Sequence, residues 1–223
     1  MICCVIALDG EAAPVIKNMQ GVQMQLLHGK KVYSGTLCGD EVRLIVCGVG
    51  KVNAAACAML ACERFKAEAI INIGTAGALR GGMNVGEIFP VSQAAEYDFD
   101  LCKINGTAIG VLNEFDERWL PLASTDGREC KKLATGDRFN GDKADYNLLT
   151  KDFGADLRDM EGAAIAHVCA HSGIPLFCYK VVSDVAGSGS TTEQYLKNIA
   201  LCYQNTEHEI CGIYGAVASK TKK

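Results

Sequence analysis

Three acidic residues stand where catalytic carboxylates are often found in α/β proteins. Asp184 follows an apolar, β-branched run, 176–182, that is typical of a buried strand. Glu161 opens a small, apolar helix pattern, and Glu11 lies where a first apolar segment gives way to another helix pattern. Because ligands of open α/β sheets bind outside the carboxyl ends of the strands, these residues are candidates for acid and base catalysis. Helix capping by Glu161 and turn formation by Asp184 are the alternative interpretations.

Alternating strand and helix patterns define the elements that would position these carboxylates. The predicted strands cover residues 2–8, a β-meander over 22–47, and then 69–73, 85–97, 130–135 and 176–182. The predicted helices cover 12–18, 52–65, 143–150, a segment that opens at Asp159, and a long amphipathic segment from the capping box at 190–193 to about Val217. This order predicts one α/β domain over residues 1–223, a three-layer α/β/α sandwich with a mixed central sheet.

Two glycine-containing segments follow predicted strands. Gly48 and Gly50 precede one predicted helix, and the segment 74–77 brackets Thr75 with glycines. A Gly-x-Gly turn lets backbone approach a ligand closely, but Asn53 occupies the third glycine position of a dinucleotide fingerprint. We therefore expect two ligand-facing turns and no NAD or other cofactor.

The composition of the chain argues against several classes of function. The chain is 49% hydrophobic and 22% charged with a formal net charge of -4, which disfavours a nucleic acid partner. The apolar segment 2–8 is short and lacks a basic region, so we expect neither a signal peptide nor a membrane span. The twelve cysteines are scattered through apolar runs without a CxxC pair, which predicts buried free thiols and a cytoplasmic location.

One pair of residues has the spacing of metal ligands. His167 and His171 lie four residues apart on one predicted helix face. The chain has no HExxH glutamate between such histidines, so packing or surface roles are favoured over metal binding. We expect no metal site.

The chain resembles the 5′-methylthioadenosine/S-adenosylhomocysteine nucleosidase family of the nucleoside phosphorylase superfamily. The resemblance covers nearly the whole chain and rests on ALDGE, GVGKVNAA, NIGTAGAL, VGEI, ATGDRF, DMEGAAIAHV and KVVSDVAG, in the family's order. Lys180 and the segment TTEQYLKN are more similar to plant-type nucleosidases than to the common bacterial ones. The resemblance implies hydrolysis of the N-glycosidic bond of methylthioadenosine and/or adenosylhomocysteine, releasing adenine and the 5-thioribose product. It also implies a homodimer with a small-molecule nucleoside substrate.

The resemblance assigns roles to individual residues. Asp184 would protonate N7 of adenine, Glu11 would activate water, and Glu161 would hold the ribose 2′-hydroxyl. The implied substrate-binding residues are Met160 under the ribose, Phe139 on the adenine, Thr75 near the water, and Leu8, Val49, Asn140, Lys180 and Ser183. Lys180 stands where most bacterial members have arginine, and it either helps to fix the ribose or snorkels at a strand end.

Other features of the resemblance bear on the neighbouring parts of the site. Thr192 occupies the region of an aromatic lid residue in many members, and Leu101 and Ile104 would reach the site from a partner subunit. Two alternatives remain open. Phosphorolysis requires positive charge, yet Asn72 and the acidic segment 9–11 stand where related phosphorylases place arginines. A non-catalytic nucleoside-binding module would have no need for three carboxylates.

Overall fold

The computed structural model of the chain describes residues 1–125, 127–139 and 142–221. Within these residues the strands are β1 (Ile2–Ile6), β2 (Gln20–Leu27), β3 (Lys30–Leu37), β4 (Asp40–Val46), β5 (Ala69–Ala78), β6 (Ile88–Glu96), β7 (Leu120–Pro121), β8 (Lys131–Thr135), β9 (Leu157–Asp159) and β10 (Leu176–Val185). The helices are α1 (Asp9–Asn18), α2 (Lys51–Phe65), α3 (Cys102–Asn105), α4 (Lys143–Asn147), α5 (Gly162–Ser172) and α6 (Thr191–Thr221), and a π-helical turn, Leu148–Asp152, follows α4.

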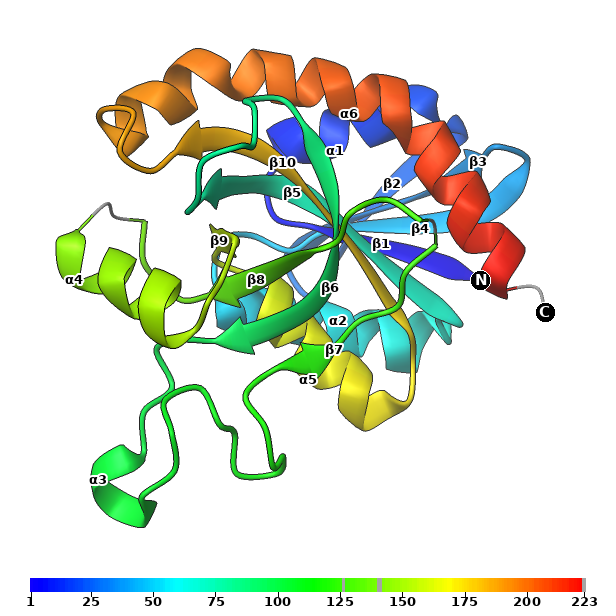
Figure 1. The fold of residues 1–223 in the computed structure, drawn as a ribbon. Coiled ribbons are helices and arrows are strands. Elements are labelled where there is room, and N and C mark those ends of the chain that lie inside the picture. The colour runs from blue at the N-terminus through cyan, green and yellow to red at the C-terminus, as the bar shows by residue number, and fades with distance from the viewer. Residues whose placement is uncertain (126, 140–141, 222–223) are drawn as a thin grey trace.

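The strands form one mixed sheet. Its order is β10-β6-β8-β9-β5-β1-β4-β3-β2, with β7 on β6. β10 also pairs in parallel with β5, so β5, β10, β6, β8 and β9 close into a ring (Figure 1). β1 pairs in parallel with β4 and β5, whereas β2, β3 and β4 form the predicted antiparallel meander. The predicted α/β fold with a mixed central sheet is therefore confirmed.

Helices cover both faces of the sheet (Figure 1). α1 packs beside α6 on one face, and α2 packs beside α5 on the other. Strand β1 shows how sequence produces these two cores, because successive side chains of a strand point to opposite faces. Cys3 and Val5 are buried in the core under α2 and α5, while Ile2, Cys4 and Ile6 are buried in the core under α1 and α6. A fully apolar strand is thus buried on both sides.

One of the two predicted glycine-rich turns is wrong. The segment 74–77 does not turn but continues strand β5 to Ala78, because β10 pairs with it along its whole length. Gly50, by contrast, is a true junction residue, since it caps α2 with a φ of 98°, a left-handed conformation that favours glycine.

Several element boundaries also differ from the sequence prediction. The helix expected to open at Asp159 begins at Gly162, with Glu161 at its N-cap and Asp159 at the end of β9. The strand expected at 85–97 begins only at Ile88. The helix expected at 143–150 changes to a π-helical turn at Leu148. The first of these shifts has a clear cause, because Asp159 pairs with Thr135 in the sheet and its Oδ2 accepts a hydrogen bond from the N–H of Gly162.

The cysteines are free in the structure, as expected. Eight of the twelve are buried as predicted, including Cys47, Cys57 and Cys178, whereas Cys102 and Cys130 are half-buried and Cys38 and Cys211 are exposed. Burial raises the pKa of the Cys178 thiol to about 12. Among the described residues, no helix has both the length and the apolarity to cross a membrane.

Candidate active site

The three carboxylates predicted from sequence line one cavity of about 460 Å³, a volume within the usual range of small-molecule sites. It lies at the carboxyl ends of β1, β5 and β10. The predicted residues that line it are Leu8, Glu11, Val49, Thr75, Phe139, Met160, Glu161, Ser183 and Asp184. Asn140 lies outside the described residues. Segments far apart in the chain thus meet around one hollow.

Glu11 is positioned by the start of α1. Its side chain is 6% exposed, and its Oε1 accepts hydrogen bonds from the backbone N–H and the hydroxyl of Thr75, both at 2.7 Å. Its Oε2 accepts a longer bond, 3.3 Å, from the N–H of Leu8. These bonds tie α1 to β5 and hold the carboxylate in one orientation, with Oε2 the less committed oxygen.

Asp184 is positioned by an irregularity near the end of β10. The register of β10 against β5 shifts between Val182 and Asp184, and such bulges re-aim side chains beside active sites. Ser183 at the bulge donates its hydroxyl to Oδ1 of Asp184 at 2.8 Å. Asp184 is 2% exposed, so its carboxyl group is held within the protein at the edge of the cavity.

Asp184 lies in surroundings that shift the pKa of its carboxyl group upward. Burial raises the pKa of its carboxyl group, while the Ser183 hydroxyl and the Arg158 guanidinium oppose that rise. Nη2 of Arg158 lies 3.8 Å from Oδ2 of Asp184, within ion-pairing distance. Desolvation prevails over this partial ion pairing, and the raised pKa suits a group that must donate a proton near neutral pH.

Glycines on β5 make room for the two carboxylates. A Cβ on Gly77 would lie 2.7 Å from Oδ2 of Asp184, closer than real contacts allow, and one on Gly74 would lie 3.2 Å from Oε1 of Glu11. The glycines that sequence analysis assigned to a turn therefore allow close approach between a strand and two acidic side chains.

Glu161 occupies the N-cap position of α5, but its side chain makes no capping bond there and instead faces the start of α2. Its Oε1 accepts a hydrogen bond of 2.9 Å from the N–H of Gly50, and its side chain is 8% exposed. Burial, reinforced by the nearby charge of Asp159, raises its pKa to about 7, against the opposing effects of Lys180 and the Gly50 bond. Glu161 is thus poised to exist in either protonation state near neutrality.

This raised pKa predicts a pH-dependent stability. A carboxyl whose folded pKa exceeds its ordinary value of 4.5 binds protons more tightly in the folded state, so its ionisation lowers stability as pH rises from about 4.5 to about 7. Over that window the free energy of unfolding of the parent should fall by roughly 3 kcal/mol relative to Glu161→Gln. Urea unfolding at stepped pH measures the difference. Parallel curves for the two proteins would contradict it, and the exposed Glu117→Gln variant should follow the parent.

Lys180 does not line the cavity, and this corrects the prediction that it contacts substrate. It is 1% exposed inside β10, so it does not snorkel either. Its Nζ lies 2.8 Å from Oδ2 of Asp159 and donates to Oδ1 of Asn72 at 2.7 Å. Although burial disfavours its charge, Asp159, Cys178 and Glu161 more than compensate and raise the pKa of Lys180. Lys180 therefore offsets the negative charges of Asp159 and Glu161 from a buried position outside the cavity.

Several residues that line the cavity were not predicted from the sequence. They are Arg138, Arg158, Asp159, Thr191, Tyr195 and Leu196. Arg158 and Asp159 end β9 and immediately precede Met160, so their only signal in the sequence was their position next to a predicted site residue. Tyr195 follows Thr191 by four positions on α6, so both lie on one helix face. Its ring meets that of Phe139 edge-on, with centroids 5.5 Å apart, and supplies an aromatic partner near Thr192.

The chain is similar to proteins of one known superfamily and, within it, to one family of enzymes. The family model of the phosphorylase superfamily matches residues 1–216, so the chain is a member of the phosphorylase superfamily. A 5′-methylthioadenosine/S-adenosylhomocysteine nucleosidase from Anoxybacillus flavithermus is 35% identical over 185 residues, covering 76% of this chain and 79% of that relative. Within the superfamily, the chain belongs to the 5′-methylthioadenosine/S-adenosylhomocysteine nucleosidase family of N-glycosyl hydrolases.

Solved structures support the fold. A nucleosidase of the same family from Colwellia psychrerythraea, in complex with adenine, superposes with a TM-score of 0.87 at 23% identity, covering 96% of this chain and 94% of that one. The native structure of a futalosine hydrolase from Helicobacter pylori also gives 0.87, at 20% identity and 98% and 97% coverage. Because proteins of different substrates share this fold so closely, the fold alone does not choose the substrate.

Proposed function

We propose that this protein hydrolyses the N-glycosidic bond of 5′-methylthioadenosine and/or S-adenosylhomocysteine, releasing adenine and the 5-thioribose product. The observation that carries the proposal is the convergence of Glu11, Glu161 and Asp184, all less than a tenth exposed, on one cavity. Membership of the nucleosidase family supports the same reaction.

Asp184 is proposed as the general acid. Breaking the bond between purine and sugar leaves electrons on the base, so protonation of N7 improves the leaving group. The raised pKa of Asp184 keeps the proton available, and Ser183 fixes the orientation of the carboxyl group. Phe139, half exposed and packed edge-on against Tyr195, is proposed to stack on the adenine ring.

Glu11 is proposed as the general base. Its Oε1 is engaged by Thr75, so Oε2 is the oxygen suited to take a proton from the attacking water. The resulting hydroxide would attack the anomeric carbon as the oxocarbenium-like character of the sugar develops. Thr75 thus positions the base, and its hydroxyl lies beside the same reaction centre.

Glu161 and Met160 are proposed to hold the ribose. Gly50 occupies Oε1 of Glu161, which leaves Oε2 to accept a hydrogen bond from the 2′-hydroxyl. Met160 lines the cavity next to it and offers a flexible apolar surface beneath the sugar. Leu8, Val49 and Ser183 are proposed to complete the wall of the nucleoside site.

Phosphorolysis is the nearest alternative, because two arginines line the cavity. Both are engaged by carboxylates, however. Arg138 pairs with Asp145 at 3.2 Å, and Arg158 lies 3.8 Å from Asp184. Asn72, where an arginine would suit phosphate, is buried and bonded to Lys180 and Val5. This arrangement favours water over phosphate as the nucleophile.

Product analysis tests the proposal. The protein is incubated with methylthioadenosine, adenosylhomocysteine, 5′-deoxyadenosine and inosine, with and without inorganic phosphate, and the products are separated by chromatography. We expect adenine and the free thioribose sugar at a rate that phosphate does not change. Formation of a sugar 1-phosphate would indicate a phosphorylase, and binding without turnover would indicate a nucleoside-binding module.

The assembly and location are further parts of this proposal. We propose a homodimer in which Leu101 and Ile104 reach the partner's cavity, since Ile104 is 81% exposed on α3, which projects from the body of the protein (Figure 1). The free cysteines support a cytoplasmic location. Because residues from both ends of the chain line the cavity, we propose that residues 1–223 act as one domain.

A further inference from the structure

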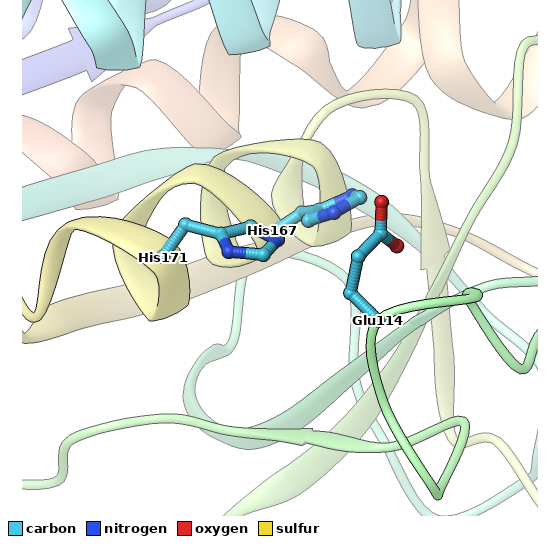
Figure 2. Close-up of side chains that lie close together, drawn as sticks. All are labelled: Glu114, His167 and His171. Atoms are coloured by element: carbon cyan, nitrogen blue, oxygen red, sulfur yellow. The ribbon is translucent and has the colours of Figure 1, made fainter.

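A second cluster of chemically capable side chains lies away from the nucleoside cavity. His167 and His171 project from α5 toward Glu114, which belongs to the loop between α3 and β7 (Figure 2). One ligand atom from each residue lies within 4.8 Å of the others. None of the three lines the nucleoside cavity. The spacing of the histidines was visible in the sequence, but the approach of a carboxylate from fifty residues upstream was not.

The helix and one aromatic ring orient the two imidazoles. Residues four apart lie on the same face of a helix, and the ring centroids of His167 and His171 are 5.2 Å apart. Phe115 packs against both, with centroids 5.6 Å from His167 and 5.2 Å from His171. The same loop therefore supplies the carboxylate of Glu114 and an apolar wall for the imidazoles.

A further carboxylate fixes the tautomer of one imidazole. Oε1 of Glu96 lies 3.3 Å from Nδ1 of His167, and Oε2 of Glu96 is held by Lys51 at 2.9 Å. A carboxylate on one ring nitrogen is the usual support of a metal-bound histidine, because it orients the ring and increases its basicity. With Nδ1 engaged by Glu96, Nε2 of His167 is the nitrogen available to an ion.

We propose that Glu114, His167 and His171 bind a divalent transition metal of the zinc type. Two imidazoles and one carboxylate form a donor set that suits Zn²⁺ and neighbouring metals, whereas Mg²⁺ and Ca²⁺ prefer oxygen ligands throughout. Glu114 and His171 are exposed and His167 is half-buried, so water completes the coordination. The site is distinct from the glycosidic chemistry, which uses carboxylates only.

Such an ion would join two parts of the fold. Glu114 and Phe115 belong to the long connection between β6 and β7 that also carries α3, and both histidines belong to α5. Binding to the folded protein alone raises its stability with metal concentration. The metal would therefore link the connection between β6 and β7, which carries α3, to helix α5.

Metal titration tests the proposal on the full chain. Co²⁺ and Zn²⁺ are titrated in a Cys38→Ser, Cys211→Ser background, which removes the two exposed thiols. We expect one equivalent of Co²⁺ to bind with nitrogen and oxygen ligands, visible in the absorption spectrum, and Zn²⁺ to displace it. The affinity should fall by about 100-fold or more in His167→Ala and His171→Ala, and Glu114→Gln should weaken it less. Zn²⁺ should raise the melting temperature of the parent but not that of His167→Ala or His171→Ala.

The chain provides matched controls, because its two other histidines lie elsewhere. His28→Ala and His208→Ala should bind the metal as the parent does, and all four histidine variants should release adenine at the parent rate if they are folded. Equal binding by the parent and the His167→Ala, His171→Ala double variant would overturn the proposal. So would an absorption spectrum dominated by thiolate ligands, or an equal loss in the control variants.

Discussion

Replacing Asp184 by asparagine is expected to reduce adenine release by about 10²- to 10⁴-fold, the usual contribution of a general acid. Asparagine fits the same space beside Gly77 and can accept the Ser183 hydroxyl, but it has no proton to give to N7. The loss should therefore appear in kcat, with the KM for methylthioadenosine nearly unchanged. Adenine release followed by absorbance or chromatography measures it.

Two further variants separate an acid role from a structural one. Arg158→Met removes a cation that lowers the pKa of Asp184, so that pKa should rise and the alkaline limb of the rate profile should move to higher pH. Arg158→Lys retains the charge and should move it less. Near-parent turnover by Asp184→Asn would show that another group protonates the purine, and an unfolded variant would show by circular dichroism.

Replacing Glu11 by glutamine is expected to cause a loss of similar size, about 10²- to 10⁴-fold in kcat, for a different reason. Glutamine can still accept the two Thr75 bonds through its carbonyl oxygen, so the position of the side chain should persist. What disappears is a carboxylate able to take a proton from water. Single-turnover measurement of adenine release reports the step directly.

Thr75→Val provides the matched control for Glu11. It removes the hydroxyl but keeps the backbone N–H that binds Oε1, so the base should remain and activity should fall less than in Glu11→Gln. A rate profile for Glu11→Gln that matches the parent in height and shape would remove this residue from the mechanism. A greater loss in Thr75→Val would instead assign the main role to the hydroxyl.

The roles proposed for the two carboxylates fit their different surroundings. Burial dominates at Asp184 and raises its pKa, with the Arg158 guanidinium 3.8 Å from it. Glu11 instead accepts hydrogen bonds from the N–H groups of Leu8 and Thr75 and from the Thr75 hydroxyl, which fix the orientation of its carboxylate. Pairs of acidic groups in contrasting environments are a general basis for acid and base assignments.

Much of the fold was readable from local patterns. The apolar run at β1, the meander of β2 to β4 and the Ala-rich α2 all form where periodicity predicts them. The cavity residues came mainly from motifs shared with a known family, and the structure brings nine of the predicted side chains to one place. Asp184 and Glu11 could also be proposed from their positions at strand ends alone, because that edge of an α/β sheet is where ligands bind.

The errors have a common origin in long-range contacts. Gly74 and Gly77 look like turn residues, yet β10 pairs with them and two carboxylates fill the space where side chains would be. Lys180 looks like a substrate contact, yet it is buried against Asp159. Glu114 is unremarkable in the sequence until folding brings it to the histidines of α5.

The sequence by itself determined the α/β class, the mixed sheet and the identity of the acidic residues, because these depend on periodicity and on residue types at the ends of elements. Only the tertiary structure decided the closed ring of strands, the partners of Lys180 and Arg158, and the pKa direction of Glu161. The physical reason is that pairing between distant strands and the desolvation of a carboxyl group depend on neighbours brought together by folding, which local spacing does not specify.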